Sequence, residues 1–135
     1  MSNLINLLDT YKGEKRELYP LTPSQMGVYL SCMHNPKGTM YNIPCTYVFD
    51  SGSLDTDRLI NAVRKAVDNH PVMKIFIDSS TGSPMMKPRD SVDFDIPVVQ
   101  VDNLEQAGKD FVKPFDLEKD ILFRFAVFRS EERRV

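Results

Sequence analysis

The most reactive side chains in this sequence belong to two cysteines and two histidines: Cys32, Cys45, His34 and His70. A nucleophilic cysteine needs a base within hydrogen-bond reach. His34 stands two residues from Cys32, a spacing that places the two side chains on different faces of a helix. The cysteine spacing matches no zinc-binding pattern, and two histidines argue against a histidine metal site. We therefore expect no metal site and no catalytic cysteine, and both cysteines are expected to be buried as small hydrophobes.

His70 is the one histidine whose position invites a catalytic role. It follows an apolar helical repeat and precedes Pro71, which predicts that it caps the C-terminus of a helix, where the helix dipole favours its charged form. No orienting partner for this imidazole is evident in the sequence. The sequence thus predicts a structural role for His70.

The bulk composition predicts one soluble domain. The chain has 135 residues, of which 41% are hydrophobic and 27% charged, ordinary values for a globular protein. A formal net charge of -2 provides no basic field, so nucleic acid is not expected as a partner. No apolar run approaches the ~20 residues that cross a bilayer, and the N-terminus lacks the basic start and cleavage site of a secretory signal. We expect a cytoplasmic protein without membrane contact.

The clearest predicted element is a helix that begins in "YPLTPSQ" and ends at "HNPKG". Thr22 is expected to cap it, with Pro23 at the first helical position and Gln25 completing a capping box. Four apolar side chains follow at helical spacing and are expected to form the buried face: Met26, Tyr29, Leu30 and Met33.

The elements that follow alternate between strands and helices. They are a strand over 41–50, a helix from the cap Asp55 to His70, a strand over 72–78 with a turn into 84–89, a strand over 94–102, a helix over 103–114 and a strand up to 128. The last strand is apolar on both faces, which predicts cover on both sides. This order predicts an α/β fold, an α+β two-layer sandwich of a sheet with helices.

The last predicted strand runs into a charged turn, and the sequence stops at Val135. A strand without a following partner leaves a row of backbone donors and acceptors unpaired. This pattern indicates a chain that ends inside a hairpin, and it predicts self-association through the unpaired sheet edge.

Four stretches together resemble the condensation domains of nonribosomal peptide synthetases: "LTPSQMGVYL", "YNIP" before a strand, "LDTDRLINAVRKAVDNHPVMKIF" and "PFDLEKDILFRFAVFR". The first is similar to the family motif Ser-x-Ala-Gln-x-Arg-Leu-Trp. Its Ser, Ala, Gln and Trp places are taken by Thr22, Ser24, Gln25 and Tyr29, while Gly27 replaces the arginine.

The third stretch resembles the family motif Arg-His-Glu-x-Leu-Arg-Thr. Its Arg, His, Glu, Leu and second Arg places are taken by Asn69, His70, Pro71, Met73 and Lys74. In the family that second arginine pairs with the aspartate of the catalytic motif, so the resemblance implies an architectural role for Lys74, as a point charge rather than a fork. It likewise implies that Ser24, Gln25 and Tyr29 hold the first helix against the sheet.

The resemblance implies a fold like that of chloramphenicol acetyltransferase, with two halves around a tunnel and this chain in the N-terminal half. Carrier proteins deliver substrates on phosphopantetheine, and the acceptor amine attacks the donor thioester to form an amide. The catalytic motif His-His-x-x-x-Asp-Gly is absent from this sequence. The implied organisation is an N-terminal arm or linker over 1–18 and the N-terminal portion of a condensation domain over 19–135, truncated before the catalytic motif. The chain alone is expected to be inactive and to bind no cofactor directly.

Two alternatives remain open at the level of sequence. The chain is a non-catalytic module that docks a carrier protein or a synthetase subunit, or it is part of an epimerization or cyclization domain, which share the scaffold. The expected partners are carrier proteins and the remainder of the domain.

Overall fold

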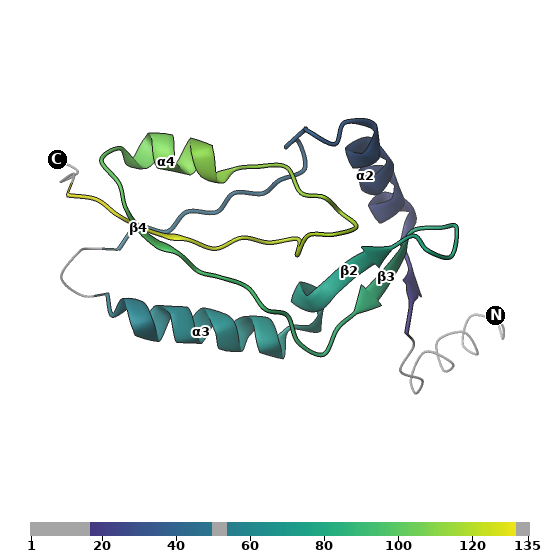
Figure 1. The fold of residues 1–135 in the computed structure, drawn as a ribbon, viewed down its shortest axis with the longest axis horizontal. Helices are drawn as coiled ribbons and strands as arrows, with labels where there is room; N and C mark the ends of the chain where they lie inside the picture. The colour runs from purple at the N-terminus through teal and green to yellow at the C-terminus, as the bar shows by residue number, and fades with distance from the viewer. Residues whose placement is uncertain (1–16, 50–53, 132–135) are drawn as a thin grey trace, which may run out of the picture.

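The structure is a computed structural model of the chain and describes residues 17–49 and 54–131 (Figure 1). Its elements in order are β1 (Tyr19–Pro20), α2 (Pro23–His34), α3 (Thr56–Asn69), a 3-10 turn (Pro71–Lys74), β2 (Ile75–Asp78), β3 (Met85–Pro88), β4 (Val98–Gln100), α4 (Leu104–Phe111) and β5 (Val127–Arg129). The predicted α/β class is confirmed. Most of the predicted 1–18 arm and the end of the predicted C-terminal hairpin lie outside the described residues.

The strands form two small sheets in place of one. The first sheet is antiparallel with the order β1-β3-β2, and the second is a parallel pair, β4 and β5. Helix α4 connects the two parallel strands, as a parallel connection requires. Figure 1 shows α3 and α4 on opposite sides of the extended segments that cross the middle of the molecule, with α2 at the end nearest the first sheet. Within the described residues, no helix is long and apolar enough to span a bilayer.

Helix α2 begins as the sequence predicts. The Thr22 hydroxyl accepts a hydrogen bond from the Gln25 backbone N–H at 3.3 Å, and the Gln25 side chain accepts one from the Thr22 backbone N–H at 2.8 Å. This reciprocal pair satisfies two donors that a helix N-terminus otherwise leaves without a partner.

The predicted apolar face of α2 is only partly correct. Tyr29 is buried, and Met26 is half-buried, but Leu30 and Met33 are 58% and 49% exposed. No other described element covers that side of the helix. The apolar spacing therefore marks a surface that the described part of the chain leaves uncovered.

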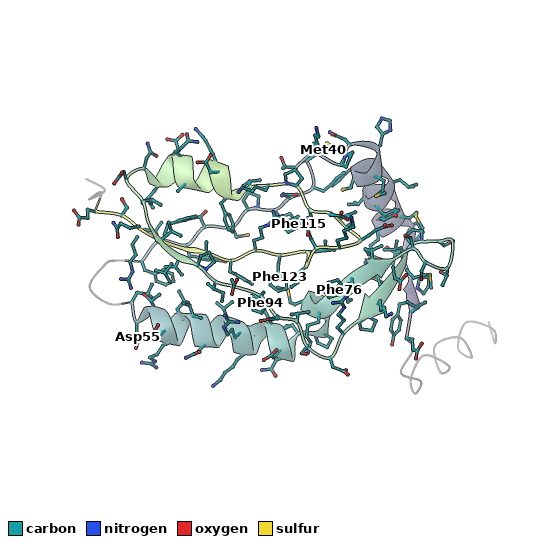
Figure 2. All side chains as sticks on the ribbon, in the orientation of Figure 1. Met40, Asp55, Phe76, Phe94, Phe115 and Phe123 are labelled. Carbon is teal, nitrogen blue, oxygen red and sulfur yellow. The ribbon has the colours of Figure 1, made fainter. Side chains whose placement is uncertain are left out.

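Helix α3 spans the predicted range and is capped by Asp55, whose carboxylate accepts a hydrogen bond from the Arg58 N–H at 3.0 Å. Its inner face buries Val67 to 1% exposure. Arg64 donates to the Phe94 carbonyl at 2.9 Å while its guanidinium lies over the Phe94 ring. This contact ties α3 to the segment that leads into β4, and Figure 2 shows Phe94 and Phe123 close together on that side of the helix.

The hairpin of β2 and β3 confirms the predicted turn around "SSTGS" and the predicted strand from Ile75 to Asp78, whereas residues 72–74 of the predicted 72–78 strand belong to the 3-10 turn. Phe76 and Ile77 are buried in it, and the Arg89 guanidinium lies 3.4 Å from the centre of the Phe76 ring. Gly82 has a φ of 90° in the turn, a conformation that favours glycine.

The strand predicted over 41–50 is wrong in its described part, 41–49. Residues 43–49 are exposed and pair with no described strand, Tyr41 lies in a turn, and Pro44 has no N–H to donate. Cys45 is accordingly exposed and Cys32 only half-buried, so the prediction of buried cysteines is wrong as well. Alternation in the sequence predicts which face each side chain takes. A strand also needs a neighbouring strand that pairs with its backbone N–H and C=O groups.

The two later strands are shorter than predicted. Only Val98–Gln100 of the predicted 94–102 strand and Val127–Arg129 of the final strand are paired. The expected cover on both sides is absent in the described chain: Leu122 is exposed and residues 123–128 are half-buried.

The core is small for a chain of this length. The described residues bury four hydrophobic side chains: Tyr29, Val67, Phe76 and Ile77. Several large hydrophobic side chains of the described residues are exposed instead, among them Met40 at 78% and Val72 at 71%. Much apolar surface is therefore left for contacts outside the chain.

The capping box makes a first prediction. Replacing Thr22 with alanine removes one half of the reciprocal pair and should lower the free energy of unfolding by about 1 kcal/mol in urea titrations. Ser24→Ala, at an exposed position in the same first turn, is the matched control and should change it by less than about 0.5 kcal/mol. Equal effects of the two substitutions would show that the cap adds nothing.

Candidate functional site

The residues that carry the family motifs fall into two groups at opposite ends of the first sheet's hairpin. Tyr29 lies in a polar cluster at the end of β2. Its hydroxyl donates to Glu118 Oε1 at 2.8 Å, and the Ser79 hydroxyl donates to the same oxygen. The cluster thus joins α2, the end of β2 and the 115–121 loop through one carboxylate.

The charges of this cluster are set by their neighbours. Hydrogen bonds from Ser79, then from Tyr29, lower the pKa of Glu118, because they stabilise its ionised form. Burial, with the hydrogen bond to Glu118, raises the pKa of Tyr29. At neutral pH the carboxylate is therefore ionised and the phenol protonated, which is the pairing that holds the three segments together.

Lys74 belongs to the second group and is buried. Its ammonium donates to the backbone carbonyls of Asp68 at 2.8 Å and Asp90 at 2.9 Å. The first carbonyl lies in the last turn of α3 and the second in the loop after β3. Lys74 therefore joins the helix to that loop, and two of its three N–H groups are engaged within the chain.

His70 is the C-cap residue of α3, as predicted. Its ring nitrogen Nδ1 donates to the Ala66 carbonyl at 2.6 Å, and its backbone N–H bonds to the Val67 carbonyl. Because a carbonyl only accepts, this contact places a proton on Nδ1. The imidazole closes the end of the helix.

Arg124 is a third anchor, which the motif comparison did not single out. Its guanidinium donates to the carbonyls of Lys113 and Pro114, both at 2.7 Å, and lies 3.9 Å from the centre of the Phe115 ring. The Lys113 carbonyl also accepts from the Asn42 side chain at 2.8 Å. The Pro-Phe-Asp-Leu turn is thus fixed by a cation from the segment that leads into β5.

The motif residues do not converge on a cavity. Two cavities of about 480 and 410 Å³ lie between α4 and the extended segments; neither is lined by Tyr29, His70 or Lys74, while residues of the PFDLEKDILFRFAVFR stretch line both. The smaller is lined largely by aromatic rings, among them Phe94, Phe111 and Phe123. The described residues bring together no group of three or more side chains suited to hold a metal. The contacts described above hold separate segments of the chain in place.

Sequence reasoning placed Thr22, Gln25, Tyr29, His70 and Lys74 on the elements where they lie, but not their partners. Glu118 is 89 positions from Tyr29 and 39 from Ser79, so no local pattern links them. The anchoring role of Arg124 could have been predicted from the sequence, because a cation inside an otherwise apolar predicted strand needs acceptors nearby. Ser24 is exposed in the first turn of α2, and no contact within the described chain explains its motif position.

The chain was compared with known proteins. The family model described as "Condensation domain" matches residues 15–135. Over 90% of its length the chain is 32% identical to bacitracin synthase 3 of Bacillus licheniformis and 32% identical to surfactin synthase subunit 1 of Bacillus subtilis (strain 168), of which it spans 2% and 3%. A crystal structure of a variant of the starter condensation domain of rhizomide synthetase matches 96% of the chain with a TM-score of 0.66 at 16% identity, and the match covers 30% of that structure's chain.

The polar cluster around Glu118 predicts an acid-sensitive fold. A folded-state pKa below the unfolded value gives stability that is present above about pH 4.3, the unfolded value for glutamate, and is lost as the pH falls through the folded value. Urea midpoints should therefore drop on acidification, and Glu118→Gln should flatten part of that drop. Asp78, whose pKa is also lowered, through hydrogen bonds from Ser80, accounts for a further part.

Glu105→Gln is the control for this experiment. It removes an exposed carboxylate whose partner among the described residues is Lys109 on the same helix. The acid-induced drop should keep its wild-type size in this variant. If Glu118→Gln also keeps it, the shared carboxylate does not hold the cluster.

Lys74 predicts a larger loss of stability. Lys74→Met keeps the apolar stem but leaves the Asp68 and Asp90 carbonyls without their donor, which should cost about 2 kcal/mol in urea unfolding. Lys65→Met, at an exposed position on α3, should cost under about 0.5 kcal/mol. A loss at Lys74 no larger than that at Lys65 would contradict the anchoring role.

Proposed function

This chain belongs to the condensation domain family, and from that premise we propose that it is the opening structural portion of a domain that forms peptide bonds in a nonribosomal peptide synthetase. The parent reaction joins two acyl or aminoacyl groups: an amine attacks a thioester, an amide forms and a thiol leaves. In this proposal the chain contributes scaffold and the rest of the domain contributes the catalytic motif.

One observation carries this proposal. Residues at the family's motif positions, including Tyr29, His70 and Lys74, form hydrogen bonds with other residues of the chain. Acyl transfer of this kind needs a proton carrier placed beside the reacting atoms. The sequence contains no His-His-x-x-x-Asp-Gly. These observations support a scaffold role for this chain, and the chain alone should be catalytically silent.

The partners and setting follow from the same premise. Carrier proteins would present the substrates on phosphopantetheine, which this chain itself would not bind, and the reaction would take place in the cytoplasm. Residues 1–18 would serve as an arm or linker before the domain portion at 19–135. Lys74 would help position the aspartate of the catalytic motif, with its third N–H as the available donor.

A second candidate is a non-catalytic module that docks a carrier protein or a synthetase subunit. The exposed apolar side chains favour it, because surface of this kind marks interaction sites. A third candidate is that the chain is part of an epimerization or cyclization domain, because these domains share the proposed scaffold.

Activity measurements separate the first two candidates. With two loaded carrier proteins, the chain alone should form no amide above the uncatalysed rate. A chimera that continues from this chain into the following part of the bacitracin synthase 3 condensation domain should form it. Turnover by the chain alone would overturn the proposal, and saturable carrier binding without turnover in the chimera would favour the docking module.

The edge of β5 that faces away from β4, where no described strand pairs, also predicts self-association of the isolated chain. Light scattering should give a mass that rises above the monomer with concentration. Ala126→Pro, which removes a donor from that edge without touching the β4 pairing, should reduce the rise. A monomer mass at every concentration would rule this association out.

A further inference from the structure

The smaller of the two cavities, of about 410 Å³, lies where the C-terminal end of α4 meets the segments that lead into β4 and β5. Its volume falls within the ~300–1,000 Å³ that is usual for small-molecule sites. Phenylalanine rings dominate its lining: Phe94, Phe111, Phe123, Phe125 and Phe128. All of these side chains are only half-buried, so part of each ring remains available to a ligand.

Three of these rings contact one another. Phe94 and Phe123 meet edge to face with ring centres 5.0 Å apart, and Figure 2 shows them close together. The Phe125 ring is tilted, with its centre 5.3 Å from that of Phe123. A further ring can add contacts of the same kind to such a cluster, and these contacts are worth more than the burial of equal aliphatic area. The lining therefore favours an aromatic ligand.

Charged residues of both signs line the same cavity: Asp95, Asp110, Lys113 and Arg124. No ion pair joins these two acids to these two bases, and the carboxylate that lies within 4 Å of Arg124 is that of Asp120, outside the lining. Two of the five N–H groups of Arg124 donate to backbone carbonyls, which leaves others for a ligand. The cavity thus offers both signs of charge beside an apolar lining.

The two exposed members of this set have no partner for their charges within the described chain. The Lys113 ammonium and the Asp95 carboxylate each lack a hydrogen bond or an ion pair with any described residue. Asp110 accepts one hydrogen bond, from the Gln106 side chain at 2.9 Å. A ligand can therefore reach a carboxylate and a cation without displacing an existing ion pair.

We infer that this cavity binds a free α-amino acid with an aromatic side chain. Its ring would lie among the phenylalanines, its ammonium beside Asp95 and Asp110, and its carboxylate beside Lys113 and Arg124. A ligand with a single charge would meet two groups of its own sign, and a neutral ligand would remove water from four charges without replacing it. The inference does not rest on the proposed function, because it assigns reversible binding and no step of amide formation.

The cavity also connects to the rest of the fold. Its wall residue Phe94 lies under the Arg64 guanidinium, 5.1 Å from the ring centre, and its carbonyl accepts from the same side chain. Arg64 belongs to α3, while the other walls come from α4 and the segment before β5. A ligand that binds only the folded chain stabilises it by mass action, so the urea midpoint should rise with ligand concentration.

The experiment titrates the full, isotope-labelled chain with L-phenylalanine and follows the amide signals by NMR. Saturable shifts should appear at lining residues, among them Asp95, Phe111 and Phe125, while the β3 strand (Met85–Pro88) should not respond. Phenethylamine, which lacks the carboxylate, and phenylpropionate, which lacks the ammonium, should each bind at least about tenfold more weakly, because each loses charge-assisted hydrogen bonds. L-Alanine, which lacks the ring, should also bind more weakly.

Two substitutions assign the charges. Asp95→Asn should weaken L-phenylalanine about fivefold and leave phenylpropionate unchanged, because that analogue has no ammonium. Lys113→Gln should weaken L-phenylalanine to a similar degree and leave phenethylamine unchanged. Both side chains are exposed, so these changes should preserve the fold. Asp93→Asn and Lys109→Gln, at exposed positions outside the lining, are the matched controls and should bind like the wild type.

Three results in the isolated chain would contradict the site. They are the absence of a saturable shift up to about 10 mM L-phenylalanine, equal weakening by the control substitutions, and binding of both single-charge analogues as tight as that of the amino acid. The shifts should also persist in the chimera described above. Their loss there would mean that the rest of the domain fills the cavity, and would overturn the inference. Because no amide formation is measured, failure here leaves the activity test of the proposed function independent.

Discussion

The constraint on which this structure depends is that the backbone N–H and C=O groups of a strand need partners on both edges unless water serves one of them. The first sheet meets this requirement locally, because a hairpin supplies most of its pairing. The second sheet does not, because β4 and β5 pair along one edge each and the 43–49 segment pairs along neither. Most of the large exposed hydrophobic side chains lie on or beside these segments and on the outer side of α2.

Long polar side chains hold the segments in place where a sheet does not. The Glu118 carboxylate joins α2 to the hairpin, Lys74 joins α3 to the loop after β3, and Arg124 fixes the Pro-Phe-Asp-Leu turn. Each contact is a hydrogen bond with one charged partner, the stronger kind. The contact of Glu118 spans 89 positions, while those of Lys74 and Arg124 reach over 6 and 10 positions. Such anchors explain why motif positions of a catalytic family are occupied here by residues without catalytic geometry.

Local signals predicted the parts of the fold that local interactions decide. The cap at Thr22, the ends of α3 and the hairpin turn at Gly82 depend on a few neighbouring residues, and all were readable. The partners of Tyr29 and Arg124 depend on tertiary contacts and were not. The 41–50 strand failed for a different reason: its alternation is genuine, but the neighbour that would make it a strand is not among the described residues. The exposure of Leu30, Met33 and Cys45 has the same origin.

The central claim is that this chain is a scaffold portion with an open position in its second sheet. Amide exchange along β5 in the unmodified chain at low concentration tests it most directly. The account predicts alternation, with slow exchange at Val127 and Arg129, whose N–H groups face β4, and fast exchange at Ala126 and Phe128, whose groups face the edge on which no described strand pairs. Uniform protection across the four residues would mean that the edge is already filled, and would contradict the account.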